Sequence, residues 1–179
     1  MKKILLPVAI ATIMLFSAFT YIASTNWKIA NGYSVKFTSK DPSGCFKSIK
    51  GDLFFDENDL ARSRFSVTID VESISTGNFL MNMIAKSGSW FDVDHYPTIK
   101  FTSSEISKTA TGYETTGTLE LHGVRKQISI PFNFKNNTFI GSFTINRLDY
   151  KVGTADGMNA HASTYLLIEI SVPVLKQGV

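Results

Sequence analysis

The chain has 179 residues, a length that fits one domain. Its 18 Lys and Arg against 15 Asp and Glu give a formal net charge of +3, too small an excess for the clustered basic face of a nucleic-acid-binding protein. Hydrophobic residues make up 44% of the chain, which excludes intrinsic disorder, and the single cysteine excludes both an internal disulfide framework and a zinc site built on cysteines.

Residues 1–25 have the pattern of an export signal. Two lysines precede an apolar run from Ile4 to Ala23, and the small residues that follow suit cleavage before Asn26. The run is also long enough to span a bilayer as an uncleaved anchor. In either case we expect residues 26–179 to form one exported domain, periplasmic or secreted, and the uncleaved form to be held at the inner membrane by the N-terminal segment.

A period-two alternation of apolar and polar residues dominates the rest of the chain, which is typical of strands with one apolar face. His122-Gly123 and Asn136-Asn137 separate consecutive strands as tight turns, because Asn and Gly tolerate positive φ angles. The pattern predicts eight strands, at residues 33–40, 46–56, 65–71, 98–108, 112–121, 125–134, 139–145 and 166–172.

One segment departs from this alternation. Between Asn78 and Lys86, the spacing of Phe79, Leu80, Met83 and Ile84 places four apolar side chains on one helical face. Thr76 or Asn78 can cap the start, and Gly88 can end the helix. The sequence therefore predicts one short helix over residues 78–86.

Eight antiparallel strands with one apolar face each can pair as a sandwich or close into a barrel. Closure removes the strand edges that invite aggregation, and an eight-stranded barrel has room for side chains or for one small ligand. Gly117 and Gly141 fall on the apolar faces, beside large aromatic residues. They either leave space for a ligand cavity or relieve strand curvature, and the sequence leaves both interpretations open.

The residues that carry most enzyme chemistry do not form recognisable motifs in this sequence. The spacings between His95, His122 and His161 match no metal-ligand pattern, and neither a nucleophile elbow nor a phosphate-binding loop is present. We therefore expect no catalytic residues, no metal and no cofactor. His122, in a tight turn at a barrel rim, is either a solvated turn residue or a partner for a polar head group.

Arg147 and Asp149 lie two residues apart at the end of an extended segment. They either form a structural ion pair at the rim, or Arg147 binds an anionic head group, because a guanidinium suits phosphate in a bidentate fashion.

Five stretches carry a family resemblance: Ile49–Asp56 (IKGDLFFD), Ile74–Asn78 (ISTGN), Trp90–Phe101 (WFDVDHYPTIKF), Gly117–Val124 (GTLELHGV) and Arg147–Tyr150 (RLDY). Together and in this order they are specific, and on them the chain resembles the YceI-like family of exported bacterial proteins. The resemblance extends over nearly all of the chain after the N-terminal segment.

This resemblance implies an all-β fold: an eight-stranded antiparallel lipocalin-like β-barrel with one short helix and a hydrophobic interior. Characterised members of the family bind long amphiphilic molecules, notably polyisoprenoids, with the tail inside the barrel, and no catalytic residues are established for the family as a whole. Many relatives have a histidine in the helix region, where this sequence has Ile84. Any contact that the histidine makes with a head group is absent here.

Two hypotheses follow. In the first, the barrel binds and carries a lipid or isoprenoid-like molecule; in the second, it is a filled barrel that acts as an envelope-stress or interaction protein without a ligand. A cavity of several hundred Å3 would separate them. The oligomeric state stays open. The first hypothesis predicts a ligand site formed by Phe37, Phe54, Phe101, Leu119, Phe132, Phe143, Arg147 and Ile168, with Met81, Met83, Ile84 and Trp90 near its mouth.

Overall fold

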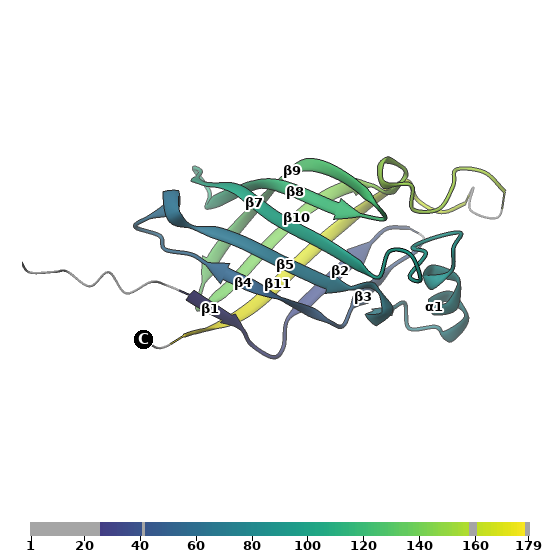
Figure 1. Ribbon diagram of the computed structural model, residues 1–179, viewed down its shortest axis with the longest axis horizontal. Helices are drawn as coiled ribbons and strands as arrows, with labels where there is room; N and C mark the ends of the chain where they lie inside the picture. Colours follow the sequence, from purple (N-terminus) through teal and green to yellow (C-terminus); the bar gives the residue numbers. More distant parts are fainter. Residues whose placement is uncertain (1–25, 41, 158–160, 178–179) are drawn as a thin grey trace, which may run out of the picture.

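The strands pair antiparallel throughout and close into a barrel (Figure 1). The computed structural model describes residues 26–40, 42–157 and 161–177. Its strands are β1 (Asn26–Ile29), β2 (Ser34–Thr38), β3 (Gly44–Phe46), β4 (Ile49–Phe54), β5 (Arg64–Asp70), β6 (Ile74–Ser75), β7 (Thr98–Lys108), β8 (Tyr113–Leu121), β9 (Val124–Lys135), β10 (Thr138–Asn146) and β11 (Tyr165–Lys176). Three short 3-10 helices accompany them, η1 (Leu60–Arg62), η2 (Val71–Ser73) and η3 (Arg147–Tyr150).

The closed ring consists of eight strands in the order β1-β4-β5-β7-β8-β9-β10-β11, with β11 pairing back to β1. The short strands β2, β3 and β6 extend the wall from β11. β2 pairs with residues 167–171 of β11, before the stretch that pairs with β1, and β3 then pairs with β2 and β6 with β3. The predicted eight-stranded antiparallel barrel is therefore confirmed. The sequence missed β1 and β6 and did not separate β3 from β4, because strands of four, two and three residues are too short to show an alternation.

The predicted helix is also confirmed, as α1 (Phe79–Lys86) at one end of the barrel (Figure 1). The Asn78 side chain caps its start by accepting a hydrogen bond from the Met81 amide at 3.1 Å. The helix ends at Ser87, whose amide donates to the carbonyls of Met83 and Ile84. The two predicted tight turns have the expected positive φ angles, 51° and 73° at His122-Gly123 and 50° and 55° at Asn136-Asn137.

The barrel end opposite α1 is filled by aromatic rings. Phe55 is 1% exposed and lies within 5.2–6.1 Å, centroid to centroid, of five other rings. Most of these contacts are edge-to-face, the arrangement that the ring quadrupole favours. This cluster, called the aromatic plug below, consists of Phe55, Phe65, Tyr113, Phe132, Phe134 and Phe139.

The polar groups at the edge of the plug are paired. The Trp27 indole donates to the Phe55 carbonyl at 2.9 Å. The Tyr113 hydroxyl donates to the Glu57 carboxylate at 2.6 Å, and this bond, together with burial and the Glu57 charge, raises the pKa of Tyr113 to about 12. The plug end is therefore closed by packing and by satisfied polar groups.

No helix among the described residues is long and apolar enough to cross a membrane. The predicted signal peptide or anchor, residues 1–25, lies outside the described residues.

Candidate functional site

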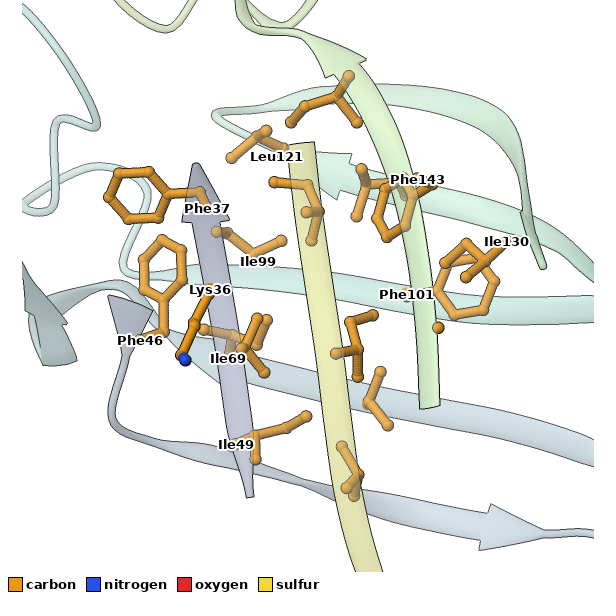
Figure 2. Close-up of a pocket in the computed structure, with 18 of the residues that line it drawn as sticks. Lys36, Phe37, Phe46, Ile49, Ile69, Ile99, Phe101, Leu121, Ile130 and Phe143 are labelled. Atoms are coloured by element: carbon orange, nitrogen blue, oxygen red, sulfur yellow. The ribbon is translucent and has the colours of Figure 1, made fainter. Parts of the chain in front are cut away.

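Between the aromatic plug and the α1 end, the inner faces of the strands surround a cavity of about 170 Å3 (Figure 2). Its walls are almost entirely apolar side chains, and Phe65, Phe132 and Phe139 of the plug form its floor. Several inward-facing side chains are only partly buried because they border this open space. They are Ile49, Val67, Ile69, Phe143, Ile145 and Ile168.

The volume limits what the cavity can hold. It lies below the ~300 Å3 at which drug-sized pockets begin. An apolar cavity of ~150 Å3 in another protein stays dry and binds benzene, so the space suits a short apolar segment rather than a whole long molecule. The barrel is therefore filled at one end and open inside at the other.

Seven of the twelve predicted site residues line this cavity, each from a different element. They are Phe37 (β2), Phe101 (β7), Leu119 (β8), Phe132 (β9), Phe143 (β10), Arg147 (η3) and Ile168 (β11). The period-two pattern correctly placed the six strand residues on the inner face. The role of all seven in binding a ligand stays a prediction.

Phe54 does not line the cavity, and its predicted place inside the barrel is wrong. Its neighbours Leu53 and Phe55 are the buried residues, with 6% and 1% exposure. The Phe54 ring instead lies under the Arg64 guanidinium, 4.9 Å from the ring centroid. Two consecutive aromatic residues at the end of β4 made both alternation phases equally plausible in the sequence.

The predicted residues on the helix do not line the cavity either. Met81, Met83 and Ile84 are 52%, 55% and 47% exposed on α1. Ala85 is the α1 residue that packs against the core. Ile84, where the family resemblance implied a histidine in many relatives, therefore lies outside the cavity wall.

Sequence reasoning missed a second set of lining residues, which includes Val35, Ile49, Val67, Ile69, Ile99 and Ile130. Val35, Ile99 and Ile130 alternate in phase with the predicted Phe37, Phe101 and Phe132. The alternation was therefore a sufficient signal for them, but favouring phenylalanines excluded the aliphatic residues.

The Arg147 side chain is 1% exposed at the α1 end of the cavity. Its Nε donates to the Ser163 carbonyl at 3.0 Å and its Nη1 to the Val152 carbonyl at 2.8 Å. Its Nη2 donates to the carbonyls of Thr154 at 2.9 Å and Ala162 at 3.3 Å. The guanidinium thus holds together the backbone of the loop between η3 and β11, an arrangement called the carbonyl cage below.

Trp90 completes this arrangement. The Arg147 guanidinium lies 5.0 Å from the Trp90 ring centroid, within the range of a cation–π contact. Trp90 was predicted at the mouth of the site, but it does not line the cavity. It contacts Arg147, which does. Burial lowers the pKa of Arg147, but arginine stays charged in proteins.

Of the two interpretations of Arg147, the structural ion pair with Asp149 is wrong. The Asp149 carboxylate lies 3.1 Å from Lys126 Nζ on β9 instead. The 3-10 helix that begins at Arg147 turns the two side chains in different directions, which an extended segment would not have done. Among the described residues, no cluster of three or more His, Cys, Asp or Glu could hold a metal ion.

His122 lies in its predicted turn but is not solvated. Both ring nitrogens are buried, and neither makes a hydrogen bond of normal geometry with the described residues. The ring packs on Tyr96, with 4.4 Å between centroids. Burial lowers the pKa of His122, and the Asp92 charge and the Tyr150 backbone oppose this only in part.

We expect the His122→Asn variant to lose less stability on acidification than the natural chain. Because the folded pKa of His122 lies below its ordinary 6.5, the unfolded chain binds more protons below pH 6.5, and this contribution to stability falls as pH falls. Asn tolerates the positive φ of this turn. Urea unfolding at pH 7.5, 6.0 and 5.0 measures the effect. The difference between the unfolding midpoints of the two proteins should narrow at low pH.

His95→Gln is the matched control. Hydrogen bonding to Asp92 and its charge raise the pKa of the exposed His95, so its contribution is present at low pH and is lost as pH rises above the ordinary value. If the midpoint difference between His122→Asn and the natural chain stayed constant from pH 7.5 to 5.0, the lowered pKa of His122 would be contradicted.

Comparison with known proteins places these features in a family. The chain matches the YceI-like domain over residues 21–174. It is 27% identical to a UPF0312 protein of Vibrio vulnificus over 167 residues, which cover 87% of this chain and 82% of that protein. It is 36% identical to a UPF0312 protein of Photorhabdus laumondii over 85 residues, which span 48% of this chain and only 44% of that protein.

Two solved structures share the fold. The crystal structure of BcnA from Burkholderia cenocepacia is 28% identical with a TM-score of 0.71, and the match covers 80% of this chain and 96% of BcnA. A polyisoprenoid-binding domain from Saccharophagus degradans, implicated in plant cell wall breakdown, is 15% identical with a TM-score of 0.63 over 86% of this chain and 99% of that domain. The barrel and the match over most of the sequence show that the chain belongs to the YceI-like domain family.

Proposed function

We propose that the protein binds one end of a long apolar, isoprenoid-like molecule inside its barrel and sequesters or carries it in the bacterial envelope, without catalysis. The observation that carries this proposal is the cavity of about 170 Å3, whose apolar walls end on the aromatic plug. Burial of an apolar tail there supplies affinity without directional contacts. The Saccharophagus degradans domain of the same fold is described as polyisoprenoid-binding, which supports this ligand class.

A specific observation also favours the second candidate, a filled barrel that acts as an envelope-stress or interaction protein. The plug occupies one end of the interior, and the open volume is smaller than the several hundred Å3 expected of a complete ligand site. Under this alternative the function lies on the loops, including residues 150–163.

The test of the proposed function is mass spectrometry of an organic extract from protein purified out of its native envelope. A co-purifying lipid at one equivalent per chain supports the carrier and identifies its cargo. An empty protein that also fails to take up added geranylgeraniol contradicts the carrier and favours the filled barrel. The intact mass of the same sample tests the proposed export, because cleavage before Asn26 and retention of residues 1–25 give different masses.

The cavity size predicts how affinity depends on chain length in a series of prenols with 5, 10, 15 and 20 carbons. Each buried methylene adds up to about 0.8 kcal/mol, but only while the chain still lies inside the barrel. We expect at least a tenfold gain in affinity from 5 to 10 carbons and less than a threefold gain from 15 to 20. Quenching of tryptophan fluorescence or calorimetry measures it. Affinity that rises equally at every step would contradict a cavity of this size.

A further inference from the structure

The strand ladder between β9 and β10 closes only part of that side of the barrel wall. β9 and β10 pair only from Lys135/Thr138 to Phe132/Gly141. The ladders on either side continue much further, to Val124 between β8 and β9 and to Asn146 between β10 and β11. Residues 124–131 of β9 and 142–146 of β10 thus face each other without a ladder between them, and this interruption is called the seam below.

The seam borders the cavity directly. Three of its inward-facing residues, Ile130 on β9 and Phe143 and Ile145 on β10, line the cavity. Figure 2 shows Ile130 and Phe143 there. Ile128, the next inward residue of β9, is only partly buried against the same core. Both edges of the seam therefore present apolar side chains to the interior.

A glycine lies in the wall where the seam begins. Gly141, the last residue of β10 in the ladder, has no side chain and lines both the cavity and a groove on the outer surface. The cavity and the groove also share Lys36, Phe132 and Ile170 among their lining residues. Inside and outside are therefore separated here by a single layer of backbone and few side chains.

A single ion pair spans the other end of the seam among the described residues. Lys126 lies opposite Leu119 in the register and so belongs to the inner face of β9, yet its ammonium reaches the Asp149 carboxylate of η3 at 3.1 Å. It also lies 5.8 Å from the Tyr150 ring centroid. The two charged side chains are 42% and 51% exposed, and ion pairs this exposed are weak.

The inference drawn from these observations rests on the proposed function, the binding of a long apolar chain. A chain longer than the cavity must leave the barrel somewhere, and the seam offers an apolar path held by a weak contact. We propose that the seam is the passage through which an apolar chain enters and leaves the cavity, and that the Lys126–Asp149 pair latches it.

The test locks the seam chemically. In a Cys45→Ser background, Ser129→Cys and Thr144→Cys place two exposed thiols across the seam, at positions that would be partners if the β9–β10 register continued. A short, reducible bifunctional cross-linker then joins them. The control is Thr144→Cys with Leu167→Cys, an exposed pair that the β10–β11 ladder already holds together. Stopped-flow fluorescence follows uptake and release of cis-parinaric acid, a linear apolar probe.

We expect the seam cross-link to slow both uptake and release at least tenfold with less than a threefold change in Kd, and reduction of the linker to restore both rates. The control cross-link should change the rates less than twofold. Equal rates before and after locking would overturn the passage while leaving the proposed function intact. Failure of every form to bind both this probe and geranylgeraniol would overturn both.

A second variant tests the latch without a cross-linker. Asp149→Asn removes the charge that holds Lys126 and should raise the uptake and release rates of cis-parinaric acid two- to fivefold at unchanged Kd. Unchanged rates in this variant would overturn the role of the ion pair as a latch.

Discussion

Replacing Arg147 with methionine is expected to lower the free energy of unfolding by about 3–5 kcal/mol. Methionine retains the apolar stem but leaves the carbonyls of Val152, Thr154, Ala162 and Ser163 without the donors of the carbonyl cage. The Val152 bond is buried and the other three are partly buried. A buried acceptor that loses its donor costs about 1–3 kcal/mol, and a partly buried carbonyl costs less because water can reach it. Urea unfolding followed by circular dichroism measures the loss.

Two further variants separate the cage from a general charge effect. Arg147→Lys keeps the charge but lacks the planar fork of donors, so we expect an intermediate loss. Arg125→Met removes an arginine that is 71% exposed and 3.7 Å from Glu120, and it should cost no more than about 0.5 kcal/mol. If Arg147→Met unfolded at the same urea concentration as the natural chain, the cage would not stabilise the fold, and an anion-binding role would regain support.

Arg147 illustrates which parts of the site the sequence could not predict. Its partners are backbone carbonyls 5–16 residues further along the chain, and a carbonyl has no identity in a sequence. The partners expected for the Arg147 guanidinium were therefore a side chain, that of Asp149, or a ligand with an anionic head group. His122 is a similar case, since its turn follows from local propensities but its burial depends on Tyr96, 26 residues away.

The fold, by contrast, was largely predictable. Alternation in β8 is unbroken from Tyr113 to Leu121, with every odd residue buried, and one phase error in such a strand would expose the whole core face. Where the alternation was ambiguous, as at Phe54-Phe55, the prediction failed. Cavity volume depends on how side chains from several strands meet, so the pattern could establish the apolar lining but not the partial filling by the plug.

The helix shows a different limit of pattern reasoning. Its apolar face was expected to lie near the cavity mouth, and α1 does lie at that end of the barrel (Figure 1). Its large apolar side chains nevertheless point to solvent, with Phe79 at 75% and Leu80 at 63% exposure. An eight-residue helix that is attached to the core through the small Ala85 cannot bury the face that the spacing defines.

Filling the cavity should abolish high-affinity binding without harming the fold. Val67→Phe and Ile168→Phe both place a ring at partly buried positions on the cavity wall. We expect the double variant to bind geranylgeraniol at least thirtyfold more weakly, a loss of about 2 kcal/mol. Its free energy of unfolding should be unchanged or raised by about 0.5–2 kcal/mol, because new contacts replace empty space. Calorimetric titration and urea unfolding measure the two quantities.

The test is decisive because it replaces smaller side chains with larger ones. Truncating any lining residue to alanine weakens the core whether or not a ligand exists, since each large-to-small core substitution costs about 2–5 kcal/mol. A filled variant that is as stable as the natural chain but no longer binds can have lost only the space. Thr102→Phe with Leu167→Phe adds the same rings at exposed, outward-facing positions and should bind normally. Undiminished binding by the filled variant would place the ligand outside the barrel and contradict the proposed carrier.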